Sequence, residues 1–347
     1  MLIATDSEAD IETPALEFPH LRLQAFDHNR VSLVLKFLRL SLKQPFDLVL
    51  LGHVNYAPLG WLLKKLRPQM RYGVMLYGVD AWKRLPPLKR RALQQANFLI
   101  SISDYTKRKA IAANGLTQQE IYLLPNALEA RPNDEKPFPS PVTSEKASLL
   151  SVCRLDKSEQ YKGVDHVIEA LPQVAARVPN VQYIVIGGGT DLERHRRLAV
   201  ELGVEDRVRF MGFVSDEALQ EQYNTCDLFV MPSAGEGFGF VFLEAMKYRK
   251  PIIAANSGGA PEVVQDGITG ELVAYGDRQR LAEALIGLCL NPAKRARMGD
   301  AGYQRLQDNF TFQHFNKNFA AILQQQMSRE VLPDALSSAS ERTVEAP

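Results

Sequence analysis

The residues of this chain whose types and spacing most clearly suggest a binding or catalytic site are two glutamates eight residues apart, Glu236 and Glu244. Glu236 lies in the glycine-rich turn 235–239, and Glu244 lies in the apolar, helical run 242–246 that follows. A carboxylate in a loop and another two turns into the next helix can both face one pocket. Carboxylates accept hydrogen bonds from hydroxyls, and the first amides of a helix can hold a phosphate. A nucleotide-sugar would need both kinds of pocket.

Two cations lie near the ends of expected elements in the same half of the chain. Arg154 follows the apolar run 149–153, and Lys162 stands just before the helical run 164–175. Side chains in these places can meet in one loop mouth, where a pair of fixed cations would neutralise a diphosphate and stabilise it as a leaving group. Two surface cations on a mobile loop would produce the same pattern, so the pair alone leaves both interpretations open.

Glycines follow several of the expected strands. The run 186–189, which contains Gly188, allows a ligand to approach the backbone closely, although it lacks the spacing of a dinucleotide-binding loop. The runs 256–262 and 267–270 suit turns at the wall of a cleft. A simple tight turn explains each of them equally well.

The two glutamates also admit a different chemistry, that of a glycosidase. Such an enzyme needs two carboxyl groups about 5 to 10 Å apart on opposite sides of one bond. Two helical turns span about 11 Å, so the spacing of Glu236 and Glu244 does not exclude this chemistry. The phosphate-binding features around them argue against it.

The elements that must position these residues alternate along the chain as apolar runs and helical stretches. Near-continuous apolar strands between helices indicate parallel sheets covered on both faces, and the ligands of such sheets bind outside the carboxyl ends of the strands. The expected strands are 46–51, 71–76, 98–102, 121–124, 149–153, 182–186, 208–211, 228–231, 251–255 and 271–273. The expected helices include 59–66, 87–96, 164–175, 193–202 and 216–225. The pattern predicts an α/β fold of two Rossmann-like, doubly wound domains that face a cleft.

Changes in composition indicate where the domains begin and end. Residues 1–131 form the expected first domain, and the segment 132–146, which is rich in proline and charge, is the expected linker. Residues 147–310 form the expected second domain. The apolar helical run within 311–330 is expected to return to the first domain, and 331–347 is expected to be a disordered tail.

From about residue 148 to residue 315 the chain resembles the C-terminal domain of the family-four (group 1) glycosyltransferases, which have the GT-B fold. Most of the motifs that carry the resemblance are loose individually, and their order and spacing make them specific together. They are Arg154 and Lys162, the glycines at 187–189, the runs 210–213 and 223–227, Pro-Ser-x-x-Glu-Gly-Phe-Gly at 232–239, and Gly-Gly-Ala-Pro-Glu at 258–262.

The resemblance implies a role for each residue that matches a motif. Glu236 would contact hydroxyls of the donor sugar, and Glu244 would bind the ribose of the nucleotide. Arg154 and Lys162 would clamp the diphosphate. The backbone that would cradle the sugar and the phosphate belongs to Gly188, Gly237, Phe238 and Gly239. Family members retain the anomeric configuration and usually need no metal, so we expect no cofactor beyond a UDP- or GDP-linked sugar as the donor substrate.

The first domain matches the family less closely. His53, Tyr77 and Asp80 follow expected strands there and are candidates for the acceptor side of the cleft. The family often has a histidine where Tyr77 stands, so no histidine role is carried over to that position. The opening residues 1–6 resemble the second strand of family members, and we therefore expect the first domain to lack the first strand and its glycine-rich loop.

The charge of the chain is balanced overall and uneven locally. A formal net charge of +1 gives no indication of nucleic-acid binding. Between Trp61 and Lys109, however, twelve Lys or Arg residues stand against two Asp residues. Such a surface suits an anionic membrane or a phosphorylated acceptor, and a solvated helical face fits the pattern as well.

The cysteines and the hydropathy pattern bear on the compartment. Cys153, Cys226 and Cys289 lack the spacing of metal ligands, and we find no secretory signal and no apolar run of membrane-spanning length. We therefore expect a cytoplasmic protein that can sit peripherally at the inner face of the membrane.

The leading hypothesis is a retaining glycosyltransferase that moves a hexose from a nucleotide-diphosphate sugar to a lipid-linked, polysaccharide or small-molecule acceptor. Two alternatives stay open, a non-catalytic nucleotide-sugar-binding protein of the same fold and a nucleotide-sugar epimerase. The residues do not distinguish the sugar, the base or the acceptor.

Overall fold

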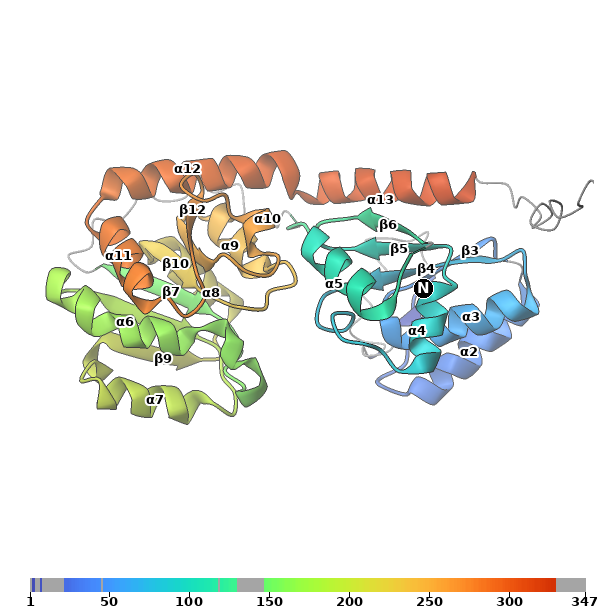
Figure 1. Cartoon of the computed structure of the whole chain (residues 1–347), viewed down its shortest axis with the longest axis horizontal. Helices are drawn as coiled ribbons and strands as arrows, with labels where there is room; N and C mark the ends of the chain where they lie inside the picture. The colour runs from blue at the N-terminus through green and yellow to red at the C-terminus, as the bar shows by residue number, and fades with distance from the viewer. Residues whose placement is uncertain are drawn as a thin grey trace, which may run out of the picture.

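The structure, a computed structural model, describes residues 2–3, 7, 22–44, 46–117, 119–129 and 147–328. Its two larger sheets are both parallel, and each forms the centre of an α/β domain (Figure 1). The expected linker at 132–146 and the expected tail at 331–347 lie outside the described residues.

The second domain is built on a six-stranded sheet with the order β12-β11-β10-β7-β8-β9. Its strands are β7 (Ser148–Val152), β8 (Gln182–Ile186), β9 (Val208–Gly212), β10 (Leu228–Met231), β11 (Ile252–Ala255) and β12 (Gly270–Val273). The chain runs from β7 outward to β9, returns to the centre, and then runs from β10 outward to β12. The strand order therefore reverses between β7 and β10, which is where an open α/β sheet binds its ligands.

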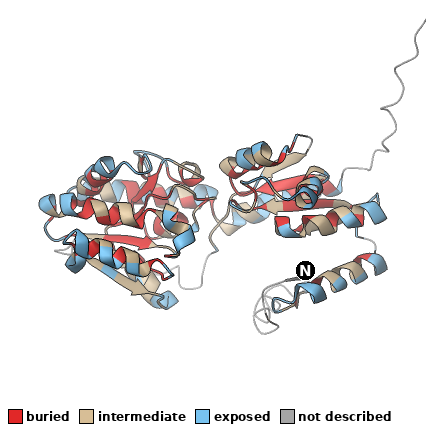
Figure 2. Ribbon diagram, turned by 60° about the horizontal axis from the view of Figure 1, so that its bottom comes forward, coloured by how far each residue is buried: buried red, intermediate tan, exposed pale blue. Residues whose placement is uncertain are grey.

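Helices cover both faces of this sheet, as its buried apolar strands require. They are α6 (Val164–Arg177), α7 (Leu192–Glu201), α8 (Asp216–Thr225), α9 (Phe240–Lys247), α10 (Ala260–Val263), α11 (Arg278–Cys289) and α12 (Pro292–Asn309), with the 3-10 turns η3 (Lys157–Lys162) and η4 (Glu205–Arg207). One core packs α6 and α11 against one face through side chains such as Ile168 and Leu285. A second core packs α9 and α12 against the other face through side chains such as Phe242 and Leu306. The buried strands form the centre of the domain (Figure 2).

The first domain is built on a four-stranded sheet with the order β3-β4-β5-β6. Its elements are α2 (Arg30–Lys43), β3 (Leu48–Leu51), η2 (Val54–Tyr56), α3 (Ala57–Leu66), β4 (Arg71–Leu76), α4 (Pro87–Gln94), β5 (Phe98–Ser101), α5 (Asp104–Asn114) and β6 (Glu120–Leu123). The strands β1 (Leu2–Ile3) and β2 (Gln24–Ala25) pair in parallel as a separate two-stranded sheet. Every residue of β5 is buried, whereas most of the edge strand β3 is half-buried. Strand β3 begins at Leu48 rather than at Phe46, because its pairing with β4 starts with Leu48 opposite Arg71.

The last described helix, α13 (Phe312–Met327), packs against the first domain although it follows the second domain in the chain (Figure 1). Its side chains Phe315, Phe319 and Ile322 join a core with residues of β5. At its far end Gln326 accepts a hydrogen bond from Arg71 at 2.6 Å and donates one to the Tyr122 hydroxyl at 2.8 Å. Helix α13 therefore covers a face of the first sheet that the earlier helices of the first domain do not cover.

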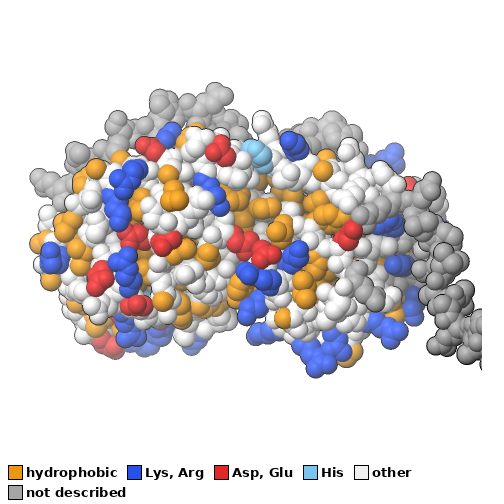
Figure 3. All heavy atoms as spheres, turned by 45° about the horizontal axis from the view of Figure 1, so that its top comes forward, with side chains coloured by type: hydrophobic (Ala, Val, Ile, Leu, Met, Phe, Trp, Pro, Cys, Tyr) orange, Lys and Arg blue, Asp and Glu red, His pale blue; other side chains and the backbone are white. Residues whose placement is uncertain are grey.

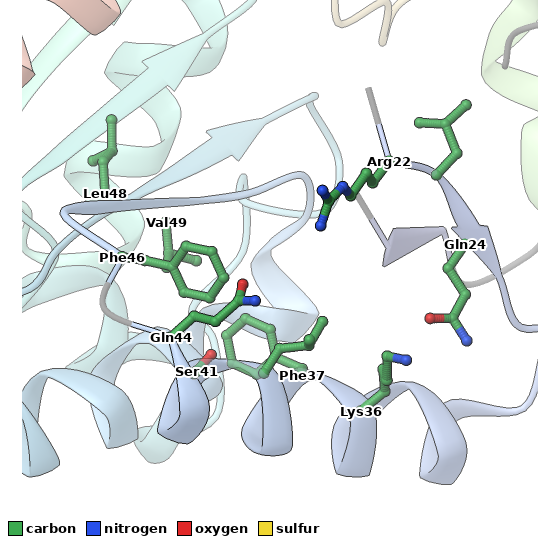
Figure 4. A pocket seen from close by; sticks show the side chains of 11 residues that line it. Arg22, Gln24, Lys36, Phe37, Ser41, Gln44, Phe46, Leu48 and Val49 are labelled. Carbon is green, nitrogen blue, oxygen red and sulfur yellow. The ribbon is translucent and has the colours of Figure 1, made fainter. Parts of the chain in front are cut away.

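A cavity of about 500 Å³ lies in the first domain beside α2, β2 and β3 (Figure 4). Apolar side chains of α2 and β3, among them Phe37, Leu40 and Val49, line much of it, and Arg22 and Lys36 add positive charge. None of its lining residues belongs to the second domain. This cavity is therefore separate from the edge of the six-stranded sheet where the strand order reverses.

Packing of α13 predicts a stability effect that is confined to the first domain. Ile322 is 6% exposed, so Ile322→Ala should destabilise this domain by about 2–4 kcal/mol through lost burial and an added cavity. Both tryptophans, Trp61 and Trp82, lie in the first domain, so denaturant unfolding followed by tryptophan fluorescence reports on it selectively. Met327→Ala, on the same helix but 65% exposed, is the control and should leave the midpoint nearly unchanged. Equal midpoints for the two variants would contradict this packing role.

Candidate functional site

Two loops meet where the strand order reverses, one after β7 and one after β10. The β7 loop (residues 153–163) includes η3, and the β10 loop (residues 232–239) leads into α9. The Ala234 amide donates to the Tyr161 carbonyl at 2.8 Å. Gly163, at φ +75°, lets the loops approach, because a Cβ there would lie 2.6 Å from the Pro232 carbonyl oxygen. The two loops therefore form one continuous surface at the carboxyl edge of the sheet.

The centre of this surface is an ion pair between Lys162 and Glu236. Lys162 Nζ donates to Glu236 Oε1 at 2.6 Å, and the two side chains are 17% and 11% exposed. Burial lowers the pKa of Lys162, but the adjacent Glu236 carboxylate outweighs burial and raises the pKa above its ordinary value. Lys162 therefore keeps its proton at neutral pH, and it provides a fixed positive charge in a partly desolvated place.

Arg154 lies on the same β7 loop but turns to a different carboxylate. It pairs with Glu159, whose side chain is largely buried, while the Arg154 side chain itself is 70% exposed. The sequence predicted that Arg154 and Lys162 would flank one loop mouth, and both do lie on the loop after β7. Each cation holds its own glutamate, so the arrangement is two ion pairs rather than two unpaired cations.

Glu244 lies on α9 and is held by a buried tyrosine. The Tyr223 hydroxyl donates to Glu244 Oε2 at 2.7 Å, and the Tyr223 ring stacks on Tyr248 with 5.4 Å between centroids. Burial, followed by the charge of Glu244, raises the pKa of Tyr223 well above its ordinary value. Tyr223 therefore remains a hydrogen-bond donor that orients the carboxylate. Tyr223 lies in the run 223–227 that resembles the family, but no role was assigned to it from the sequence, because nothing in its local pattern links it to a helix 21 residues away.

The β10 loop is supported from behind by the glycines that follow β11. The Gly259 amide donates to the Glu236 carbonyl at 2.7 Å, and a Cβ on Gly258 would lie 2.6 Å from the same oxygen. Gly237 is equally crowded, because a Cβ there would lie 2.6 Å from the Tyr77 carbonyl oxygen of the first domain. Close backbone packing on two sides thus holds the loop that carries Glu236.

Helix α9 begins directly after this loop. Gly239 precedes its first turn at φ +97° and, as a glycine, offers no capping side chain. Amides in such a turn can bind an anion. Phe238 is buried and packs on Phe310 with 5.7 Å between ring centroids, so its side chain belongs to the core and only its backbone can line the surface.

Gly188 lies at the outer end of the surface, in the loop after β8. Its carbonyl accepts from the Leu155 amide at 2.9 Å, which ties the β8 loop to the β7 loop. A Cβ on Gly188 would lie 3.0 Å from the ring of Phe213, a side chain that is itself exposed. The glycine therefore leaves room beneath an exposed aromatic ring.

Three candidate residues lie in the first domain. His53 Nδ1 accepts from the Asn55 amide at 3.1 Å, and His53 Nε2 lies 3.9 Å from Asp80 Oδ2. Both carboxylate oxygens of Asp80 are buried, and within the described part of the chain neither has a hydrogen-bond partner. Burial, followed by the charge of Asp80, raises the pKa of Tyr77. Asp80 thus has acceptor capacity that the described residues leave unused.

The described residues contain no group of three or more His, Cys, Asp or Glu side chains that could hold a metal ion. Nor does any helix in the described ranges have the length and apolar character needed to cross a bilayer.

Residues 132–305 match the family model described as glycosyl transferases group 1. A GDP-mannose-dependent alpha-(1-6)-phosphatidylinositol monomannoside mannosyltransferase of Mycolicibacterium smegmatis is 32% identical over 70% of this chain and 66% of its own length. A related mannosyltransferase of Corynebacterium glutamicum, which is named as acting on the monoacylated lipid, is 30% identical over 70% of this chain and 67% of its own length. The chain thus spans just under two thirds of the Mycolicibacterium smegmatis relative.

Solved structures share the fold over almost the whole chain. The Anabaena protein Alr3699/HepE, solved in complex with UDP, has a TM-score of 0.75 at 21% identity and covers 93% of this chain and 91% of its own. Sucrose-phosphate synthase of Thermosynechococcus elongatus has a TM-score of 0.71 at 22% identity and covers 88% of this chain and 84% of its own. These likenesses confirm the predicted two-domain α/β fold of the GT-B type.

Support of the β10 loop predicts that Gly258 tolerates no side chain. In Gly258→Ala the new methyl group would collide with the Glu236 backbone, so amide hydrogen exchange across residues 235–239 should accelerate by about tenfold or more. The matched control is Gly203→Ala, which has a similar positive φ of +63° but nothing within 4 Å of its Cβ position. If the amides of residues 235–239 exchange as slowly in both variants as in the unmodified protein, the β10 loop does not depend on the close packing of Gly258 against the Glu236 backbone.

Proposed function

Because this chain belongs to the group 1 glycosyl transferases, we propose that it transfers a hexose from a nucleotide-diphosphate sugar to a lipid-linked acceptor. The observation that carries the proposal is the partly buried Lys162–Glu236 pair at the point where the strand order reverses. An ion pair in that position costs desolvation free energy, and it offers a cation to a diphosphate and a hydrogen-bond acceptor to a sugar hydroxyl.

In the proposed complex the donor lies along the surface from Gly188 to α9. Lys162 has three N–H donors and uses one on Glu236, so it can also donate to a phosphate oxygen. Arg154, exposed at the mouth, adds a second cation, and the first turn of α9 adds backbone amides. Glu236 accepts hydrogen bonds from sugar hydroxyls, and Glu244, oriented by Tyr223, accepts them from the ribose.

The proposed reaction breaks the bond between the anomeric carbon and the diphosphate oxygen and forms a bond from that carbon to the acceptor oxygen. The nucleoside diphosphate leaves with the bonding electron pair, and Lys162 and Arg154 stabilise the charge that develops on it. The acceptor proton passes to an oxygen of the departing diphosphate, on the same face of the sugar, so the anomeric configuration is retained. A cleft that excludes water would favour transfer over hydrolysis.

Asp80 is the proposed acceptor contact. Its two oxygens have no hydrogen-bond partner among the described residues, so they can accept from an acceptor hydroxyl that reaches them. His53, 3.9 Å away through Nε2, would hold the carboxylate in place. Because the Tyr77 carbonyl lies against Gly237, this side of the cleft borders the β10 loop.

The relatives favour one donor and one class of acceptor for the first experiments. Those named above use GDP-mannose and act on a phosphatidylinositol mannoside. We therefore propose GDP-mannose as the donor and a glycosylated phospholipid as the acceptor, with UDP-glucose as the comparison donor.

A lipid acceptor would bring the first domain to a membrane surface. Basic side chains are spread over this domain, which lies on the right in Figure 3. On α2 the apolar side chains Val31, Leu35 and Leu42 are exposed in the same helix as Lys43, and α3 beside it exposes Leu66 next to Lys65. Exposed apolar side chains among cations suit peripheral binding to anionic lipid.

Site variants test the proposed transfer. Lys162→Ala and Glu236→Ala should each lower kcat/KM by about 10²–10³, because each removes a group that faces the reacting atoms. Glu244→Ala should act mainly on the KM for GDP-mannose. Product formation with labelled GDP-mannose and phosphatidylinositol monomannoside in detergent provides the measurement, and Glu193→Ala, an exposed glutamate on α7, is the control. Unchanged kinetics for Lys162→Ala and Glu236→Ala would refute the site, and donor binding by calorimetry without any transfer would favour the non-catalytic alternative.

Vesicle binding tests the proposed membrane surface. The protein should co-sediment with vesicles containing phosphatidylinositol more than with neutral vesicles, and added salt should weaken the binding. The double change Leu35→Ser and Leu42→Ser should reduce the bound fraction by about threefold or more. Val200→Ser, at a similarly exposed valine of the second domain, should have no effect. Equal binding to neutral and anionic vesicles would contradict an electrostatic role for this surface.

A further inference from the structure

Two side-chain contacts join the domains beside the β10 loop. The Ser103 hydroxyl, at the start of α5 in the first domain, donates to the Gly237 carbonyl of the second domain at 2.6 Å. The oxygen of the Ser103 hydroxyl also accepts a hydrogen bond from the Thr106 amide at 3.1 Å, and it thereby caps α5. Ser103 is buried. One hydroxyl therefore begins a helix of the first domain and holds the loop that carries Glu236.

Glu262 makes the second contact, from the opposite domain. Its Oε2 accepts from the Asp104 amide at 2.7 Å, and its Oε1 accepts from the Tyr105 amide at 2.8 Å. A carboxylate is most favourable at this end of a helix, where unpaired amides and the helix dipole both attract negative charge. Arg305 fixes Glu262 from behind by donating to its backbone carbonyl at 2.7 Å. Glu262 is thus anchored in the second domain and reaches into the first.

These contacts connect the β10 loop and the start of α5 from two directions. Glu262 follows Gly259, whose amide already holds the Glu236 carbonyl, and Ser103 holds the next carbonyl along, that of Gly237. Any movement of α5 relative to the second domain therefore pulls on both sides of the loop. Because α5 has Ser103 as its own cap, the helix does not need Glu262 in order to form.

We propose that Glu262 and Ser103 are positioning residues, which set the start of α5 in the first domain against the β10 loop and so fix the distance between acceptor and donor. Neither residue needs to touch the reacting atoms. When the two contacts are made, the acceptor side is held in register with the sugar. When they are broken, the domains separate, water enters, and the donor is hydrolysed instead of transferred.

The inference rests on the proposed transfer, and one set of measurements separates the two ideas. Glu262→Gln replaces one accepting oxygen with an amide group that cannot accept, and Ser103→Ala removes the hydroxyl. Each variant should lower kcat for transfer by about ten- to a hundredfold and raise the ratio of free mannose to transferred mannose. Calorimetric affinity for GDP-mannose should stay within about twofold of the unmodified protein, because Lys162, Glu236 and Glu244 are intact. Ser103→Thr, which keeps the hydroxyl, should restore the ratio, and Glu283→Gln on the exposed face of α11 is the control.

Hydrogen exchange and solution scattering give a readout that needs no activity. In Glu262→Gln the amides of Asp104 and Tyr105 should exchange faster, and the radius of gyration should increase. These two changes support the contact between the domains even if the unmodified protein transfers no sugar, a result that would refute the proposed function alone. Unchanged exchange and radius would overturn the inference. A parallel loss of transfer and of donor affinity would also overturn it, because the residues would then act on the donor site itself.

Discussion

The ion pair between Lys162 and Glu236 is the interaction on which the arrangement of the loops at the carboxyl edge of the second sheet depends. A carboxylate at that depth needs a partner, because burying an isolated charge is costly. The partner comes from a loop on a neighbouring strand, and the two loops can approach because Gly163 has no side chain. Gly258, in the loop after β11, lets a third segment support the β10 loop from behind. The glycines of the motifs and the charged residues of the motifs therefore serve one purpose, which is to bring Lys162 and Glu236 into contact at the edge of the sheet.

Much of the fold could be predicted because parallel strands buried on both faces leave continuous apolar runs in the sequence. The strands β4, β8 and β10 and the helix α8 have the predicted limits, and the loops that carry Arg154, Lys162 and Glu236 lie at the predicted edge. Strand ends were predicted less well where a strand is not covered. Phe46 was expected in β3, but it lies before the first residue that pairs with β4.

The partners within the site could not be predicted in the same way. Lys162 bonds to Glu236, 74 residues away, and Ser103 bonds to Gly237, 134 residues away. Tyr223 shows the same limit within one domain, since its hydroxyl reaches Glu244 on another helix. Such contacts depend on how whole elements pack, and neither hydropathy periodicity nor motif spacing records them. For the same reason the sequence indicated that His53 and Asp80 were candidates but not that they lie side by side.

The return of α13 to the first domain has a consequence for the order of folding during synthesis. The strands of the first domain leave the ribosome before those of the second domain, but Phe98, Ile100 and Leu124 are covered only when α13 has been made. The second domain is continuous between β7 and α12, so it can close before α13 has been made. The first domain is thus completed only after the second domain has been made, and part of its apolar face stays exposed to chaperones and to aggregation until α13 emerges.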